Sequence, residues 1–362
     1  PLFHIGGVNC PACPTFYLGG TVLIARAFDP GETLGYIGDA KLGVTHFLGV
    51  PAMYNALKVH ADNAKTDFSR VVTPFVGAEA VPEPLLNWWI ERGLKLSEGY
   101  GMTEATCLIS INPVAGDRKV GSVGLPFPYS DVKILDCAAD GTIKSEKMVD
   151  EVAEICVNNP GVMHGNTYVE ADKNEGLFAG DYMRTGDLGR IDADGFIWIT
   201  GRAKDLIIRG GHNIDPAEIE DAMLAHQQVA FAGAIGQPDA HAGEVPCVSV
   251  ELVEGGTVTA EELLEHAQIH IHERAAFPKY VEVLDELPKT AVGKIFKPDL
   301  RKAAITRIYD AALEKAGVAA RVKVVIDDKK RGLVAQLDAN GASEEDVNKV
   351  LGAFTRPWEW VG

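Results

Sequence analysis

The sequence predicts a multidomain protein of mixed α/β and α+β class, and two patterns along the chain indicate this class. As far as about residue 116, short apolar runs alternate with helical patterns, which is typical of an α/β layer with a mostly parallel sheet. Beyond this point glycine and proline become frequent between short apolar runs, which favours a small antiparallel β subdomain. We therefore expect a large domain made of an α/β part (1–116) and a β subdomain (117–201), a small mobile α+β domain (202–297) and an α/β extension (298–362).

The α/β part is predicted from strand–helix alternation. Proline at position 51 suits the first position of a helix, because the N–H group that proline lacks would have no partner there. The expected strands are 21–25, 45–50 and 71–76, and the expected helices are 30–42, a helix that starts at Pro51, and 82–92.

The β subdomain is predicted from short strands separated by turn residues. The segment from Asp192 to Gly195 stands between two apolar runs and is a hairpin signal. The expected strands are 131–135, 151–157 and 196–200.

The small domain and the extension are predicted from helix caps and apolar runs. Asp215 before Pro216 indicates a capped helix start, and Ser343 with two glutamates after it indicates another. The other expected elements are strands 229–235, 245–252, 280–284, 322–326 and 332–337, and helices 259–275 and 298–315.

Composition limits the classes of partner. The content of hydrophobic residues, 46%, and of charged residues, 23%, is ordinary for a globular protein. The formal net charge of -17 argues against a surface that binds nucleic acid or anionic membranes. No apolar run approaches the ~20 residues that a transmembrane helix requires. We therefore expect a cytoplasmic protein with small-molecule substrates and no nucleic-acid partner; a homo-oligomer is compatible with the sequence.

The cysteines give a weaker signal. Six cysteines in 362 residues do not make a disulfide scaffold. Cys10 and Cys13, with His4 nearby, leave open a metal or redox pair. No second cysteine pair follows at a useful spacing, which favours small buried thiols instead.

Four glycine-containing segments give the strongest functional signal. They are Gly-Tyr-Gly-Met-Thr-Glu at 99–104, Thr-Gly-Asp at 185–187, Gly-Arg-Ala-Lys-Asp at 201–205 and Pro-Lys-Thr-Ala-Val-Gly-Lys at 288–294. In this order and at these separations they resemble the adenylate-forming superfamily, most closely the acyl-CoA synthetases. The resemblance implies an enzyme that activates a carboxylic acid with ATP as an acyl-adenylate and passes the acyl group to coenzyme A.

The resemblance assigns the nucleotide site to two glycine-rich turns. It implies that Tyr100 and glycine-permitted backbone form a flat seat for adenine, and that Asp187 accepts hydrogen bonds from both ribose hydroxyls. Arg202, which follows after one hairpin, suits ribose or phosphate oxygens. The residues implied to bind the nucleotide are Gly77, Ala78, Glu79, Tyr100, Gly101, Met102, Thr103, Asp187 and Arg202.

The resemblance also implies three catalytic residues. Lys294, on a glycine-containing loop, would bridge the substrate carboxylate and the α-phosphate, two anions that repel each other. Glu104 would ligate Mg²⁺ beside the phosphates, because Mg²⁺ usually takes one or two carboxylates together with phosphate oxygens. Arg202 would contribute charge at the same place.

The remaining implied residues concern movement and the second substrate. Lys204 occupies the position of the hinge at which such enzymes turn their small domain between the two steps. Arg209, Gly210 and Gly211 would line the tunnel for the pantetheine arm of coenzyme A, and His4 would border the acyl pocket.

The resemblance covers about residues 1–297, the latter part of the family's large domain and the whole small domain. The family's phosphate-binding loop is expected upstream of residue 1, so we expect a truncated chain that lacks this anchor, and whether the chain acts alone stays open. Two alternatives stay open: a non-catalytic fragment that binds a nucleotide, coenzyme A or a partner, and an adenylation module that loads a carrier protein. The extension resembles those of some bacterial fatty-acyl ligases and favours a fatty or alicyclic acid.

Overall fold

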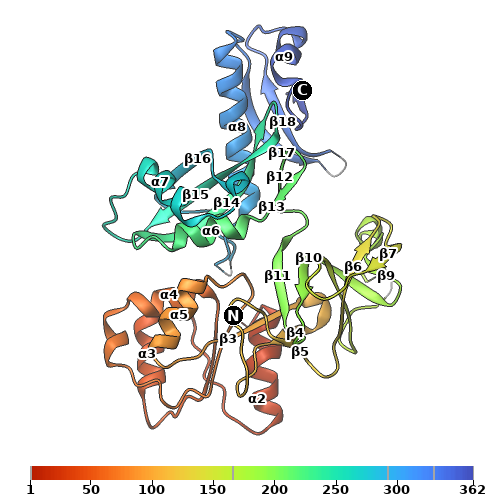
Figure 1. The fold of residues 1–362 in the computed structure, drawn as a ribbon. Coiled ribbons are helices and arrows are strands. Elements are labelled where there is room, and N and C mark those ends of the chain that lie inside the picture. The colour runs from red at the N-terminus through yellow and green to blue at the C-terminus, as the bar shows by residue number, and fades with distance from the viewer. Residues whose placement is uncertain (1, 165–166, 292, 329–330, 362) are drawn as a thin grey trace. The chain divides into compact units, whose positions relative to one another are not determined.

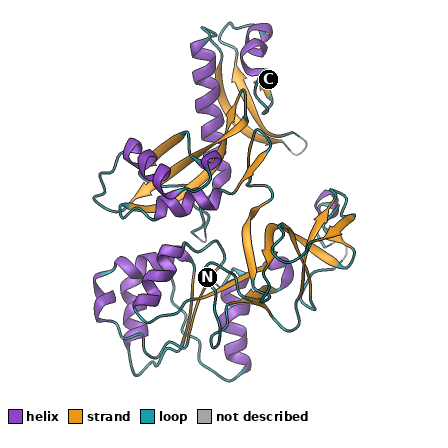
Figure 2. Cartoon of the chain, in the orientation of Figure 1, coloured by secondary structure: helices purple, strands orange, loops and turns teal. Residues whose placement is uncertain are grey.

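A computed structural model describes residues 2–164, 167–291, 293–328 and 331–361 (Figure 1). The chain forms two compact units, the first ending at Lys204 and the second beginning at Asp205. Helices and strands alternate or intermingle in both units, as the secondary-structure colouring shows (Figure 2). This mixed α/β class agrees with the prediction. Across the described ranges, no helix is both long enough and apolar enough to cross a membrane.

The first sheet has five strands in the order β1-β2-β3-β4-β5. The first three pair in parallel, and β4 and β5 add to them antiparallel. The strands are β1 (His46–Gly49), β2 (Thr73–Gly77), β3 (Ser97–Met102), β4 (Cys107–Ile111) and β5 (Leu125–Pro126). The parallel part of the sheet therefore presents the carboxyl ends of β2 and β3 on one edge.

Three helices cover this sheet, α3 (Pro30–Gly38), α4 (Pro51–Val59) and α5 (Glu83–Glu91), and η2 (Ala61–Lys65) follows α4. Tyr54 and Trp89 are fully buried at the centre of their core and meet edge to face with ring centroids 5.7 Å apart. Pro51 occupies the first turn of α4, as its position in the sequence predicts.

The N-terminal segment is helical rather than extended. It contains α1 (Ile5–Gly7), a π-helix η1 (Val8–Ala12) and α2 (Cys13–Tyr17). The strand expected at 21–25 is wrong: these residues form no ladder, and Leu23 and Ile24 are more than half exposed. An apolar run becomes a strand only where a neighbouring strand supplies backbone partners. Residues 21–25 have no such partner, because β1, the first strand of the sheet, pairs among the described residues with β2 alone.

The second sheet is antiparallel throughout, as expected for the β subdomain. Its strand order is β11-β10-β8-β6-β7, and β9 pairs with the start of β10. The strands are β6 (Asp131–Cys137), β7 (Ile143–Glu146), β8 (Ala153–Asn158), β9 (Phe178–Ala179), β10 (Tyr182–Ile191) and β11 (Ile197–Arg202), and η4 (Ala171–Asn174) is a short connecting helix. The other short helix, η3 (Thr103–Ala105), joins β3 to β4 in the first sheet.

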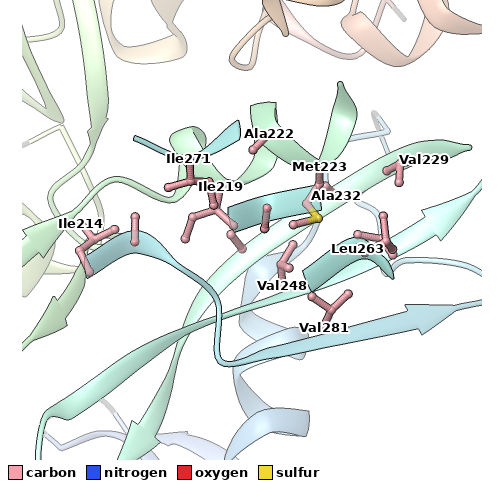
Figure 3. Close-up of a cluster of buried hydrophobic side chains, with 14 of the residues drawn as sticks. Ile214, Ile219, Ala222, Met223, Val229, Ala232, Val248, Leu263, Ile271 and Val281 are labelled. Atoms are coloured by element: carbon pink, nitrogen blue, oxygen red, sulfur yellow. The ribbon is translucent and has the colours of Figure 1, made fainter. Parts of the chain in front are cut away.

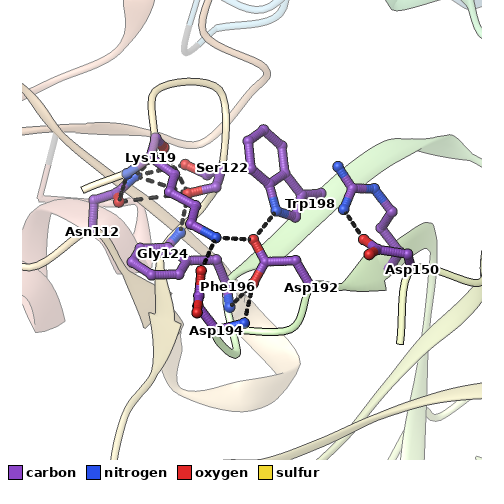
Figure 4. Close-up of polar contacts among 10 residues, drawn as sticks. Asn112, Lys119, Ser122, Gly124, Asp150, Asp192, Asp194, Phe196 and Trp198 are labelled. Carbon is purple, nitrogen blue, oxygen red and sulfur yellow. Dashed lines mark hydrogen bonds and ion pairs between the residues drawn. The ribbon is translucent and has the colours of Figure 1, made fainter. Parts of the chain in front are cut away.

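The predicted hairpin between β10 and β11 is stabilised by the carboxylate of Asp192 (Figure 4). The amine of Lys119 donates to Asp192 at 2.6 Å and to Asp194 at 2.7 Å, and the indole of Trp198 donates to Asp192 at 2.9 Å. Two backbone N–H groups, those of Asp194 and Phe196, donate to the other oxygen at 3.0 Å. Burial raises the pKa of Asp192, but these donors together lower the pKa far below its ordinary value.

The second unit begins with a sheet whose order is β13-β12-β15-β14, to which β16 adds in parallel beside β15. One face packs on two helices around Ile219, Met223 and Leu263, all fully buried (Figure 3). The elements are β12 (Ile207–Arg209), β13 (His212–Ile214), α6 (Pro216–Leu224), β14 (Val229–Asp239), β15 (Gly243–Leu252), α7 (Ala260–His270), η5 (Arg274–Ala276) and β16 (Tyr280–Leu284).

Caps explain where these two helices begin. The Asp215 side chain accepts a hydrogen bond from the N–H group of Ala217, as predicted. Thr259 forms a capping box with Glu262 at the start of α7. The helix expected to continue to residue 275 ends at His270, because Ile271 leaves the helical region with a ψ of 128°.

The last part of the chain is built on one long helix, α8 (Lys297–Lys315). Its first half carries Leu300 and Ala304 into the core behind β14 and β15, and its second half carries Tyr309 and Leu313 into a separate core. That second core is formed with β17 (Arg321–Asp328), β18 (Gly332–Asp338), α9 (Glu344–Leu351) and β19 (Trp358–Trp360). One helix therefore serves two hydrophobic cores.

We expect Asp192→Asn to lower the free energy of unfolding of the first unit by about 1–3 kcal/mol at pH 7, because it deprives Lys119 and Trp198 of a charged acceptor. Because the folded-state pKa is lowered, this contribution is complete above the unfolded pKa of about 3.9 and is lost as the pH falls below it. The difference between the variant and the native protein should therefore shrink below about pH 4. Urea unfolding followed by circular dichroism measures the free energy of unfolding of both proteins. Asp194→Asn, which changes a mostly exposed carboxylate, is the control and should have a smaller effect. An unchanged difference at low pH would contradict this account.

Candidate functional site

The first unit brings three predicted residues together around one buried carboxylate. Asp187 lies on β10, directly opposite Arg202 on β11. Asp187 is only 6% exposed. The Tyr100 hydroxyl, on β3, donates to Oδ2 at 2.7 Å, and the Nε–H group of Arg202 donates to Oδ1 at 2.9 Å. The Arg202 side chain is two-thirds exposed, so the cluster reaches the surface of the unit on that side.

The electrostatics of this cluster hold Tyr100 in its protonated form. Burial raises the pKa of Tyr100 well above its ordinary value, and the negative charge of Asp187 raises it further. The hydroxyl therefore acts as a donor to the carboxylate. The N–H group of Asp187 donates to the Thr185 hydroxyl at 3.1 Å, and this hydroxyl donates to the carbonyl of Ile155 at 2.8 Å. The Thr-Gly-Asp segment thereby fixes where the carboxylate points.

Glycine is required where the two turns meet the sheet. Gly77 stands opposite Gly99 in the ladder, and a Cβ on Gly77 would lie 2.6 Å from the Gly99 carbonyl oxygen. A Cβ on Gly101 would lie 1.6 Å from the carbonyl oxygen of Cys107. Ala78 has a φ of 78°, a left-handed conformation that costs a non-glycine residue about 1–2 kcal/mol. It is exposed, and the partly buried Glu79 follows it.

Glu104 lies just past β3, where Met102 ends the strand and Thr103 begins η3. Its Oε1 accepts a hydrogen bond of 2.5 Å from the hydroxyl of Tyr168, and its backbone carbonyl accepts one of 2.8 Å from the N–H group of Met163. The side chains of the described residues form no cluster of three or more possible metal ligands. A lone carboxylate here fits Mg²⁺ that takes its other ligands from phosphate oxygens and water.

The side chain of His4 caps the first helix, α1. Its Nδ1 accepts a hydrogen bond from the N–H group of Gly6 at 3.1 Å, and the residue is partly buried. The capping bond fixes the orientation of the imidazole ring at the start of α1. Its predicted place beside an acyl pocket stays a prediction.

Lys294 belongs to the second unit and sits in a short loop closed by a bridge between Lys289 and Ile295. The N–H group of Lys294 donates to the Thr290 hydroxyl at 3.1 Å, and its carbonyl accepts from the N–H group of Thr290 at 2.7 Å. Val292, also part of the predicted motif, lies outside the described residues. The backbone at Lys294 is therefore held by its own loop.

This loop is anchored to the sheet by an ion pair. The Lys289 amine lies 2.7 Å from a carboxylate oxygen of Glu251 on β15 and 4.2 Å from the ring centroid of Phe231. Both charged side chains are largely buried. The sequence motif predicts Lys294, whereas the residues that hold its loop in place come from strands far away in the chain.

The remaining predicted residues lie where the two units adjoin in sequence. Lys204 is an exposed turn residue and the last residue of the first unit. Gly210 and Gly211 form the turn between β12 and β13 with φ of 57° and 88°, so both require the conformational freedom of glycine. The guanidinium of Arg209 donates to the carbonyl of Ala275 at 2.7 Å.

Two contacts at the site were not predicted from the sequence. Tyr168 is 64 residues from its partner Glu104. Asp205 forms an ion pair of 2.7 Å with Arg301 on α8, 96 residues away. No local pattern links residues at such separations. A meeting of Lys294 with the Asp187 cluster joins residues of different units and stays a prediction.

Comparison with known families gives two matches. The model of the AMP-binding enzymes matches residues 1–166, and the model of the AMP-binding enzyme C-terminal domain matches residues 218–294. The first match includes Tyr100 and Glu104, and the second ends at Lys294. The two matches together cover most of the chain.

Curated proteins and solved structures of CoA ligases are similar to this chain. A marinolic acid–CoA ligase from Pseudoalteromonas is 35% identical over 95% of this chain and 53% of its own length, and a feruloyl-CoA synthase from Amycolatopsis is 34% identical over 83% and 60%. The chain thus spans little more than half the length of these relatives. The structure of o-succinylbenzoate CoA synthetase from Bacillus subtilis, in complex with an acyl-adenylate intermediate, is 31% identical with a TM-score of 0.70 and coverages of 83% and 59%.

We expect Gly101→Ala to destabilise the first unit by about 3 kcal/mol or more, because the new Cβ would overlap a backbone carbonyl that cannot rotate away. Gly35→Ala is the matched control: it lies within α3, nothing lies within 4 Å of the added Cβ, and it should be neutral or stabilising by up to about 1 kcal/mol. Thermal unfolding measures both, and equal melting temperatures for the two variants would refute the steric argument.

Proposed function

Because this chain belongs to the AMP-binding, adenylate-forming enzyme family, we propose that it acts as an AMP-forming ligase that joins a carboxylic acid to coenzyme A. ATP and coenzyme A are the other substrates. The observation that supports this most directly is the buried carboxylate of Asp187, fixed by Tyr100 and Arg202 beside glycine-rich turns.

The Asp187 carboxylate has the capacity to bind a ribose. Each of its oxygens already accepts one hydrogen bond, one from Tyr100 and one from Arg202. An ionised carboxylate offers about four lone-pair sites, so each oxygen retains one for a ribose hydroxyl. Because the existing bonds hold the group rigidly, little conformational entropy is lost when a nucleotide binds.

The turns after β2 and β3 suit the adenine base. Ala78 projects only a methyl group at an exposed position, and Gly77 before it has no side chain. A flat heterocycle can therefore approach the backbone closely there. In this proposal Glu79, Met102 and Thr103 line the same nucleotide site.

The first chemical step is assigned to Lys294, Glu104 and Arg202. A carboxylate oxygen of the acid attacks the α-phosphorus of ATP, the bond to pyrophosphate breaks, and an acyl-adenylate forms. The Lys294 ammonium would stabilise the charge that spreads between the two anions, and Arg202 would contact the phosphate or ribose oxygens. Glu104 would hold Mg²⁺, which neutralises phosphate charge when it is bound.

The second step transfers the acyl group to sulfur. The coenzyme A thiolate attacks the acyl carbonyl carbon and AMP leaves, so the same acyl pocket serves both steps. We assign Lys204 as the hinge, because it is the last residue of the first unit. Arg209, Gly210 and Gly211 would then line the path of the pantetheine arm, whose close approach the two glycines permit.

We propose a fatty or alicyclic acid as the substrate, with His4 beside its pocket. This proposal rests on the extension after residue 297, and most of that extension lies within the 95% of the chain that is similar to marinolic acid–CoA ligase. A feruloyl-CoA synthase, named for an aromatic acid, shares a shorter stretch. The choice between the two acid classes is open to a direct assay.

We expect the protein to catalyse acid-dependent exchange of pyrophosphate into ATP, and to form a CoA thioester once coenzyme A is added. A panel of long-chain, alicyclic and aromatic acids, each with Mg²⁺, measures the acid class by the rate of exchange. Exchange with aromatic acids alone would overturn the substrate proposal. Binding of AMP without exchange for any acid would overturn the enzymatic one and leave a nucleotide-binding role.

We expect Lys294→Ala to slow acyl-adenylate formation by about 10²–10³-fold, because it removes the cation that offsets repulsion between the reacting anions. Thioester formation from supplied acyl-adenylate should survive. Lys302→Ala, at a partly exposed lysine on α8, is the control and should leave both steps unchanged. An equal loss of the two half-reactions in the Lys294 variant would contradict the assigned role.

A further inference from the structure

Two cysteines from distant parts of the chain meet in the first unit. Cys10 lies in the π-helix η1 and Cys107 is the first residue of β4. Their sulfur atoms are 2.7 Å apart, although the residues are 97 positions apart in sequence. This separation exceeds the length of a disulfide bond by about 0.7 Å. Cys13, the residue that the sequence pattern pairs with Cys10, is exposed.

The surrounding backbone holds both sulfur atoms in place. Helix η1 packs against β1 and β4, and Pro11 lies within it. Cys107 is 8% exposed and follows Thr106; both residues have left-handed φ angles, 87° and 53°. Two consecutive non-glycine residues in this region are held there by the surrounding structure, so the Cys107 side chain has a defined direction.

The pair has the protonation pattern of an attacking and a resolving thiol. The hydrogen bond between the two sulfur atoms lowers the pKa of Cys107. The same bond raises the pKa of Cys10, and burial raises it further. The buried Cys107 is therefore the sulfur more readily ionised, and the thiol that would resolve its oxidation is already in contact with it.

We propose that Cys10 and Cys107 form a reversible disulfide when the protein meets hydrogen peroxide. The Cys107 thiolate attacks one peroxide oxygen, the O–O bond breaks, and Cys107 becomes a sulfenic acid while hydroxide leaves. The Cys10 sulfur then attacks the Cys107 sulfur, the S–O bond breaks, and the leaving hydroxide takes up the Cys10 proton to give water. Two thiols are oxidised and one peroxide is reduced to two waters. A thiol reductant reverses the bond by exchange.

The location gives this site a structural consequence. Cys107 pairs directly with Met102 in the β3–β4 ladder, and its carbonyl oxygen is the atom that excludes any side chain at Gly101. The disulfide would link η1, in the helical segment that begins after His4, to β4, which pairs with the strand that carries Tyr100. This inference concerns the thiols alone and does not rest on the proposed ligase activity.

The test is a peptide map of the folded protein after treatment with hydrogen peroxide, with free thiols blocked by alkylation in acid. Trypsin places Cys10 in peptide 1–26 and Cys107 in peptide 96–118. We expect these two peptides to be linked, two of the six thiols to be lost, and both changes to disappear on reduction. The linked pair should exceed any other cysteine pair by about tenfold or more, because the two groups are already in position.

Two variants of the same helical segment make the result specific. Cys13→Ser should give the same linked peptide, since Cys13 takes no part. Cys10→Ser should abolish the link and leave the Cys107 sulfenic acid available to dimedone, which should label peptide 96–118. A wild-type protein without the linked peptide would overturn the proposal. A link that persists undiminished in Cys10→Ser would also overturn it and would assign the bond to Cys13.

Discussion

The first unit depends on one buried carboxylate that joins its two sheets. Asp187 comes from the antiparallel sheet, and Tyr100, which donates to it, comes from the mixed sheet. An unpartnered carboxylate in the interior would cost several kcal/mol. The hydroxyl of Tyr100 and the guanidinium of Arg202 offset this penalty and set the relative position of β3 and β10. The geometry of the proposed nucleotide site therefore follows from the need of the buried Asp187 carboxylate for hydrogen-bond donors.

The elements that the sequence predicts well are those specified by local chemistry. Asp215 caps a helix, Pro51 starts one, and the turn at Asp192 closes a hairpin through its own backbone bonds. Each of these depends on residues within a few positions. The strand expected at 21–25 failed because a strand also needs a neighbour. For the same reason the two-residue strands β5 and β9 carry no signal of their own, since only the partner strand defines them.

In the candidate site, too, local sequence motifs can be recognised and contacts between distant residues cannot. Its glycine-containing segments are linear, so they can be recognised in the sequence together with Asp187, Glu104 and Lys294. The contacts that orient them join distant residues, as in the ion pair of Asp205 with Arg301 and the bond from Tyr168 to Glu104. Such pairs are specified by packing of the whole unit. The residues to which we assign chemistry can thus be recognised in one sequence, whereas the residues that orient them cannot.

Helix α8 makes the C-terminal extension inseparable from the loop that precedes it. The helix starts three residues after Lys294, buries Leu300 against β14 and β15, and continues without a break to Leu313 in the core formed with β17 and β18. A chimera that exchanged the extension at the end of the recognised motif would cut through a shared hydrophobic interior. Recombination between such chains should therefore succeed before Asp205, where a compact unit begins, and fail within α8.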